Sequence, residues 1–201
     1  MRNEAVRRVL AWSWRGFAMC AALALAVGCA TAPRQPVGVM DTPEHHYQLG
    51  MTFLDQGDLG GAEREFAKAL ELNPKHGPSL AGQGLTMVLA GNDRVGLDRV
   101  EDGVDEAQGV KEEMAARVAL IRAYTAKCQA GTLSAEDLVD KSRDVFERAR
   151  DLDPNDPALH FYQGQAYVQA LDFPPAEEMF QTVLRLGRGY QDKAKARWEM
   201  V

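Results

Sequence analysis

Histidine and cysteine side chains are the groups with which this chain could hold a metal ion or perform nucleophilic catalysis. The sequence contains His45, His46, His76, His160, Cys20, Cys29 and Cys128. None of them falls in an HExxH or CxxC motif, and the two adjacent histidines point to different faces of a helix. No G-x-S-x-G turn and no phosphate-binding loop is present either. These spacings predict no catalytic residue, no metal site and no cofactor, so we do not expect an enzyme.

Cys29 has a sequence context that indicates covalent modification. Residues 1–28 begin with arginines, continue with the uncharged run GFAMCAALALAV and end in small residues. The run is shorter than the roughly 20 apolar residues of a membrane-spanning helix. Residues 26–29, Ala-Val-Gly-Cys, resemble the lipobox of bacterial lipoproteins. The resemblance implies that diacylglycerol is attached to the Cys29 thiol, that the chain is cleaved after Gly28, and that the new amino terminus is acylated.

Lipid on Cys29 would anchor the protein in the cell envelope. Two or three acyl chains hold a protein firmly on a bilayer, because each buried methylene adds roughly 0.8 kcal/mol. Ala30 follows the cysteine in place of aspartate, which resembles outer-membrane sorting in enterobacteria. We therefore expect the periplasmic face of the outer membrane rather than the inner membrane. The alternative is an ordinary cleaved signal in which Cys29 is incidental.

The charge balance restricts the partners. The whole chain carries a net charge of −6. Residues 1–28 contribute four arginines and one glutamate, or +3, so the chain without them carries −9. An acidic body repels nucleic acids and anionic lipid headgroups, so we expect no nucleic-acid binding.

Cys128 would be the remaining thiol after processing, which excludes an intramolecular disulfide. The apolar residues near Cys128 predict that it is a small buried residue.

The segment after Cys29 has the composition of a linker. Residues 30–42, ATAPRQPVGVMDT, contain prolines and a glycine and have no periodic apolar face. Fully extended, the segment would reach roughly 40 Å. The predicted organisation is a signal peptide over 1–28, a lipidated tether over 29–42 and a folded domain over 43–201.

Apolar and small residues recur in the folded domain with the spacing of a helical repeat. In the first stretch they fall at Leu49, Gly50, Phe53, Ala62, Phe66, Ala69 and Pro74. This spacing resembles the tetratricopeptide repeat (TPR) pattern L-G-x2-Y…A-x3-F…P. The resemblance implies an all-α fold, a superhelix of about four helix-turn-helix repeats and a C-terminal capping helix. It also implies a protein that binds peptides or other proteins.

The repeats differ in regularity. Four repeats and a cap are expected at 43–76, 77–110, 111–156, 157–190 and 190–201. The helices of repeat one should span Pro43 to Asp55 and Leu59 to Leu72. Repeat three is stretched, because Phe146 lies 80 positions after Phe66, where two periods would give 68.

The 12 additional residues of repeat three should lie around a long helix over 110–130 and the loop over 131–133. Ser134 is expected to cap the helix that follows, with Asp137 three positions on. Repeat two is degenerate, because Gly96 and Gly103 stand where alanine is expected. Each glycine costs roughly 1 kcal/mol in a helix, so this second helix of repeat two should be the softest part of the array.

The first helix of each repeat lines a concave groove in TPR proteins. Carried over by repeat position, the groove residues are Tyr47, Met51, Leu54, Ala81, Leu85, Val88, Phe161, Gln165 and Val168. This largely apolar set implies a protein partner that inserts an amphipathic or hydrophobic segment. Tyr47 and Met51 replace the Lys/Asn/Arg clamp that grips a terminal carboxylate in chaperone-binding members, so that mode is not expected. The alternative is that these side chains pack against neighbouring helices of the same chain.

The opening repeat carries the most specific resemblance. Residues 46–74, HYQLGMTFLDQGDLGGAEREFAKALELNP, are similar to the first repeat of type IV pilus pilotins. Those small TPR lipoproteins help a secretin to reach or assemble in the outer membrane. The resemblance implies a lipid-anchored periplasmic scaffold for secretin or pilus assembly. The alternatives are an adaptor for peptidoglycan enzymes or for other outer-membrane assembly or export complexes, and a carrier or enzyme, for which no residue argues.

Overall fold

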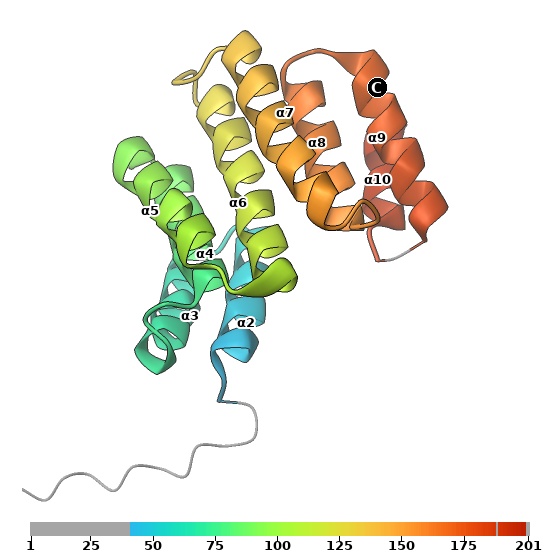
Figure 1. The fold of residues 1–201 in the computed structure, drawn as a ribbon. Coiled ribbons are helices and arrows are strands. Elements are labelled where there is room, and N and C mark those ends of the chain that lie inside the picture. The colour runs from blue at the N-terminus through green and yellow to red at the C-terminus, as the bar shows by residue number, and fades with distance from the viewer. Residues whose placement is uncertain (1–40, 188, 200–201) are drawn as a thin grey trace, which may run out of the picture. The chain divides into compact units, whose positions relative to one another are not determined.

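The computed structural model describes residues 41–187 and 189–199, which form helices and loops (Figure 1). The helices in this range are α2 (Pro43–Asp55), α3 (Leu59–Leu72), α4 (Gly77–Leu89), α5 (Asp93–Glu106), α6 (Gly109–Gln129), α7 (Ala135–Leu152), α8 (Pro157–Gln169), α9 (Phe173–Leu186) and α10 (Gln191–Trp198). The all-α fold class predicted from the sequence is confirmed. The predicted signal peptide, Cys29 and the tether up to residue 40 lie outside the described residues.

Short-range side-chain contacts determine where several helices begin. Thr42, Asp58, Ser134 and Asp156 each precede a helix, and an oxygen of each side chain accepts a hydrogen bond from the backbone N–H three residues later. These bonds satisfy amides that the first turn of a helix leaves without partners. The predicted cap at Ser134 is confirmed. Because such signals are local, the helices of repeat one begin and end where the sequence predicted.

The helices form consecutive pairs arranged in two layers (Figure 1). The first helices of the pairs, α2, α4, α6 and α8, contact one another in order and form the inner layer. Each also packs against the second helix of its own pair, α3, α5, α7 or α9, and α10 packs against α9. This arrangement of repeats is an α-solenoid.

The additional residues of repeat three lengthen its two helices. α6 has 21 residues, whereas α2, α4 and α8 have 13 each. α7 has 18 residues, whereas α3, α5 and α9 have 14 each. The long first helix was expected, but most of the remaining increase lies in α7 rather than in the loop after α6.

Glycines bring the backbones of α4 and α5 into direct contact. A methyl group at Gly84 would lie 2.6 Å from the carbonyl oxygen of Gly96 and 2.6 Å from the amide nitrogen of Val100. A methyl group at Gly103 would lie 2.5 Å from the amide nitrogen of Ala81. The prediction that α5 is the softest helix counted only the cost of glycine within one helix. The structure gives Gly96 and Gly103 a packing role that offsets this cost.

Phenylalanine rings fill the space between helices in repeats one and four. Phe66 and Phe180 are fully buried. The ring of Phe66 lies against Gly50 and Gly82, where a methyl group would come within 2.5 Å of it.

Cys128, predicted to be buried, is half-buried and packs against the hydrophobic core.

Leu171 is the one residue other than glycine with a positive φ, +62°, among the described residues. It lies in the turn between α8 and α9, where the first two pairs have Gly57 and Gly91. The left-handed conformation costs an ordinary side chain roughly 1 kcal/mol, and Leu171 recovers little by burial because it is 74% exposed. Asparagine tolerates this conformation, so Leu171→Asn is expected to raise the free energy of unfolding by about 0.5 kcal/mol.

Urea denaturation of the Leu171→Asn variant measures this gain. Val95→Asn is the matched control, since Val95 is also exposed but lies within helix α5. A loss of stability in Leu171→Asn equal to that in the control would mean that the turn is not strained.

His46 links the stability of repeat one to pH. Its Nδ1 lies 2.7 Å from Oε2 of Glu65, and its Nε2 lies 2.8 Å from Oδ1 of Asp41. Burial disfavours the imidazolium, but the hydrogen bonds to Glu65 and Asp41 outweigh it and raise the pKa of His46. The folded state therefore binds the proton more tightly than the unfolded state. The resulting stability is fully present below about pH 6.5 and is lost as pH rises through the raised pKa.

We expect His46→Gln to remove this dependence. Burial lowers the pKa of His76, so His76 contributes stability that increases with pH, opposite to His46. The effect of His46 is therefore measured as the difference in free energy of unfolding between wild type and variant. The difference in their free energies of unfolding should shrink as pH increases from 6 to 9. A constant difference, or an NMR titration of the His46 ring at or below its ordinary pKa, would contradict the assignment.

Candidate functional site

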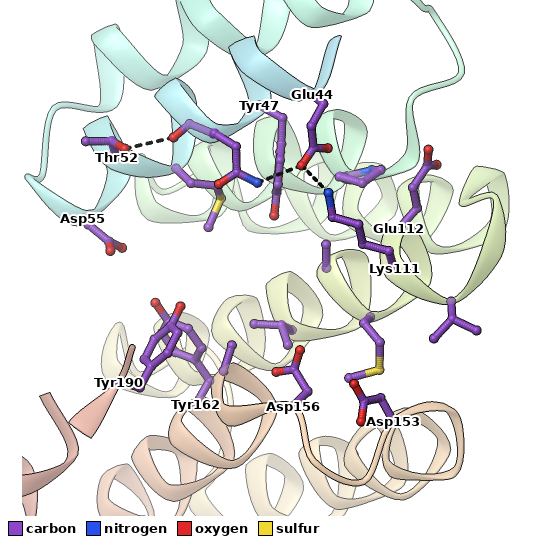
Figure 2. A pocket seen from close by; sticks show the side chains of 18 residues that line it. Glu44, Tyr47, Thr52, Asp55, Lys111, Glu112, Asp153, Asp156, Tyr162 and Tyr190 are labelled. Atoms are coloured by element: carbon purple, nitrogen blue, oxygen red, sulfur yellow. Dashed lines mark hydrogen bonds and ion pairs between the residues drawn. The ribbon is translucent and has the colours of Figure 1, made fainter. Parts of the chain in front are cut away.

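The inner helices enclose a cavity of about 580 Å³, called the groove below. Its walls come from α2, from α6, from the loop before α8 with the start of that helix, and from Tyr190 (Figure 2). Aromatic and apolar side chains that line it include Tyr47, Met51, Met114, Val118, Ala158 and Tyr162. Tyrosine and methionine provide large contact areas with adaptable shape. The groove is therefore suited to hold side chains of another protein.

Carboxylates predominate among the charged residues of the groove. The ionised side chains that line it are Glu44, Asp55, Glu112, Asp153, Asp156 and Lys111. Nζ of Lys111 lies 2.8 Å from Oε1 of Glu44. Burial opposes ionisation of Glu44, but hydrogen bonds from Lys111 and Gln48 lower its pKa, so it is charged at neutral pH. Five carboxylates and one ammonium group make the groove acidic.

A second cavity, of about 540 Å³, adjoins the groove. Asp55 and Tyr162 line both spaces. The other residues of the second cavity include Leu54, Phe161, Gln165, Arg122, Lys193 and Arg197. Its charged side chains are mainly basic, opposite to those of the groove.

Asp55 connects the first described helix to the last. Its Oδ1 lies 3.3 Å from Nη2 of Arg122 on α6, and its Oδ2 lies 2.9 Å from Nζ of Lys193 on α10. The Arg122 guanidinium lies 4.5 Å from the centre of the Tyr162 ring, and the Lys193 ammonium 5.4 Å from that of Tyr190. We call these five residues the clasp. Each of its cations combines a carboxylate with an aromatic ring.

Three phenol groups enter the groove from two sides. Figure 2 shows Tyr47 pointing into it from α2, with Tyr162 and Tyr190 on the opposite wall. Burial raises the pKa of Tyr47 well above its usual range and that of Tyr190 to about 12. The hydroxyls therefore remain protonated at neutral pH, and each can donate or accept a hydrogen bond.

Five of the nine predicted groove residues line a cavity. Tyr47 and Met51 line the groove. Leu54, Phe161 and Gln165 line the second cavity. Among these five, Met51 and Gln165 are half-buried, whereas the other three side chains are almost wholly buried.

The other four predicted residues lie in or against the core. Ala81, Leu85 and Val88 are buried on α4, and Val168 is half-buried beside the core cluster. The close approach of α5 covers Ala81 and Val88, which face Gly103 and Gly96. For these residues the structure corresponds to packing within the chain, the alternative that the sequence left open.

Groove residues from α6 were absent from the sequence prediction. Met114, Ala115 and Val118 line the groove, but stretched repeat three broke the register from which positions were carried over. The available signal was the spacing of Lys111, Ala115, Val118 and Arg122, which places them on one face of a helix.

Histidines serve mainly as hydrogen-bonding groups within the fold. Nδ1 of His76 lies 2.7 Å from Oγ of Ser79, and Nε2 of His160 lies 2.9 Å from the carbonyl oxygen of Pro154. In the part of the chain that the structure describes, no three His, Cys, Asp or Glu side chains gather in a way that could hold a metal ion. None of the helices found there combines the length and apolar character needed to cross a membrane.

Comparisons with known proteins agree with this architecture. Residues 44–76 match the tetratricopeptide repeat family model. TTC0263, a TPR protein of Thermus thermophilus, is 19% identical over 79% of this chain and 81% of its own, with a TM-score of 0.62. No curated protein sequence matches the chain.

Two further solved structures match the chain with lower structural similarity. MamA from Desulfovibrio magneticus RS-1 is 27% identical over 73% of this chain and 76% of its own, with a TM-score of 0.45. PilF of Pseudomonas aeruginosa is 13% identical over 79% of this chain and 89% of its own, with a TM-score of 0.32. The fold assignment rests on the family match and on the Thermus structure.

Proposed function

We propose that this chain, which matches the tetratricopeptide repeat model at residues 44–76 and has the fold of a TPR protein, is a lipid-anchored TPR scaffold of the bacterial periplasm. In this proposal its inner helices hold a segment of a partner protein, and it serves the assembly of an envelope machine. The machine that we favour is the secretin of a type IV pilus.

One observation carries the binding part of the proposal: the groove. Side chains from sequence-distant helices meet around a space large enough for several partner side chains. Its lining of tyrosine, methionine and valine offers contact area and hydrogen-bonding hydroxyls. Such a lining favours recognition of a protein segment.

The anchor rests on the residues around Cys29. A basic start, a short apolar run, small residues and the cysteine stand in the order of a lipoprotein signal, and a proline-containing linker follows. Cys29→Ser is expected to abolish lipid attachment and processing. If the variant retains the mobility and membrane attachment of the wild type, the anchor is refuted.

The choice of a pilus machine rests on the similarity of residues 46–74 to the first repeat of pilotins. Loss of a pilotin leaves secretin monomers in the wrong place, whereas loss of an adaptor for peptidoglycan enzymes alters septation or the cell wall. A deletion strain therefore separates the favoured machine from the alternative adaptor.

In-cell photocrosslinking tests the groove. We would place p-benzoylphenylalanine at Met51, in the groove, and at Gln165, in the second cavity, because both are half-buried. The control position is Val95 on α5, which is 64% exposed and lines neither cavity.

Adducts at Met51 or Gln165 but not at Val95, identified by mass spectrometry as a secretin or pilus subunit, are the expected result. Adducts to cell-wall enzymes would keep the scaffold and change the machine. Adducts at Val95 alone would refute the groove as the binding surface.

A further inference from the structure

We infer that the groove selects a cationic amphipathic segment, one in which lysine or arginine side chains alternate with apolar ones. This inference rests on the proposed function and specifies the chemistry of the partner. A carboxylate clamp binds a negatively charged group of its partner. The groove of this chain would instead bind positively charged groups.

Three groove carboxylates form no ion pair with any described residue. Glu112, Asp153 and Asp156 each use one oxygen to accept a backbone N–H, at 3.0, 2.9 and 2.8 Å respectively. Their second oxygens accept no hydrogen bond from the described part of the chain. These carboxylates add negative charge to the groove that no ion pair with a described residue neutralises.

Tyr47 presents its hydroxyl to the groove, an observation independent of the carboxylates. Its side chain is only 8% exposed, and no described residue hydrogen-bonds its hydroxyl. The phenol points into the groove (Figure 2). The hydroxyl is accessible from the groove and can donate or accept a hydrogen bond with a bound segment.

The clasp shows how this surface binds a cation. Arg122 contacts Asp55 and the ring of Tyr162, and Lys193 contacts Asp55 and the ring of Tyr190. The two cations of the clasp thus each combine one carboxylate with one tyrosine ring. The Tyr47 hydroxyl and the three carboxylates that form no ion pair with a described residue offer oxygen acceptors to a cation from outside.

The apolar part of the lining determines the rest of the segment. Met51, Met114, Val118 and Ala158 present carbon and sulfur atoms between the acidic residues. A fully charged peptide would leave them uncovered, and an acidic peptide would be repelled. A segment of mixed cationic and apolar character matches both parts.

Fluorescence anisotropy with designed peptides tests the inference. The probe is a fluorescein-labelled 12-residue peptide of alternating leucine and lysine, and its twins carry glutamine or glutamate in place of lysine. Each is titrated with the full 201-residue chain in nonionic detergent. The lysine peptide is expected to bind about tenfold more tightly than the glutamine twin, and the glutamate twin more weakly still.

Charge removal within the groove supplies the site-specific comparison. The variant Glu112→Gln/Asp153→Asn/Asp156→Asn keeps side-chain oxygens for the three backbone hydrogen bonds while removing three charges. The matched control, Glu101→Gln/Asp102→Asn/Asp105→Asn, removes three exposed charges from α5. The groove variant should bind the lysine peptide about tenfold more weakly, and the control less than twofold more weakly.

Equal weakening in both variants would overturn the inference, because net charge rather than the groove would then attract the peptide. Ala115→Trp, which places a large side chain in the groove, separates the inference from the proposed function. If the glutamine twin binds as tightly as the lysine peptide and Ala115→Trp abolishes both, the groove remains the binding site and cation selectivity is refuted. If Ala115→Trp leaves all binding unchanged, the groove itself is refuted.

Discussion

Phe66→Ala is expected to lower the free energy of unfolding by about 4 kcal/mol. The ring is fully buried and lies between Gly50 and Gly82 on neighbouring helices. Neither glycine has a side chain that could move into the space left by the ring. A cavity that cannot collapse adds its own cost to the lost burial, so this substitution belongs to the severe end of its class.

Urea denaturation monitored by circular dichroism measures the loss. Phe66→Leu should cost much less, about 1.5 kcal/mol, because most of the volume is retained. Phe173→Ala is the matched control, since Phe173 is 41% exposed and its removal should change stability by less than about 0.5 kcal/mol. Similar losses for Phe66→Ala and Phe173→Ala would mean that Phe66 is not a packing centre.

Gly84→Ala is expected to lower the free energy of unfolding by about 2 kcal/mol. The added methyl group would lie 2.6 Å from two backbone atoms of α5. Backbone cannot rotate away as a side chain can, so the two helices must separate. This loss exceeds the gain of roughly 1 kcal/mol that alanine gives within a helix.

Gly60→Ala is the control because its sign should be opposite. Gly60 lies in helix α3, and the nearest atom to an added methyl group, Nη1 of Arg64, is 3.6 Å away. That variant should be about 0.5–1 kcal/mol more stable than the wild type. If Gly84→Ala is also stabilising in thermal and urea denaturation, α4 and α5 are not in backbone contact.

Much of the fold could be predicted because its signals are local or periodic. Asp58 and Ser134 cap helices through their own side chains, and Phe66 recurs as Phe180 in the equivalent place of repeat four. The benefit of Gly96 and Gly103 is not local, since it depends on which helix lies opposite. Sequence alone gave only their cost within a single helix.

The groove was less predictable for a related reason. Repeat positions identified Tyr47 and Met51, because α2 follows the regular pattern. Asp153 and Asp156 come from a loop whose placement depends on the added length of α6 and α7. No spacing in the sequence indicates that this loop and α2 line the same space.

The clasp changes how the array should lose its structure. In an ordinary repeat array each unit contacts only its neighbours, so the ends fray independently. The Asp55–Lys193 ion pair joins residues 138 positions apart. Fraying of α10 therefore removes a contact of α2, and the two ends become thermodynamically coupled. Because the pair is partly exposed, added salt should loosen this coupling and make unfolding less cooperative.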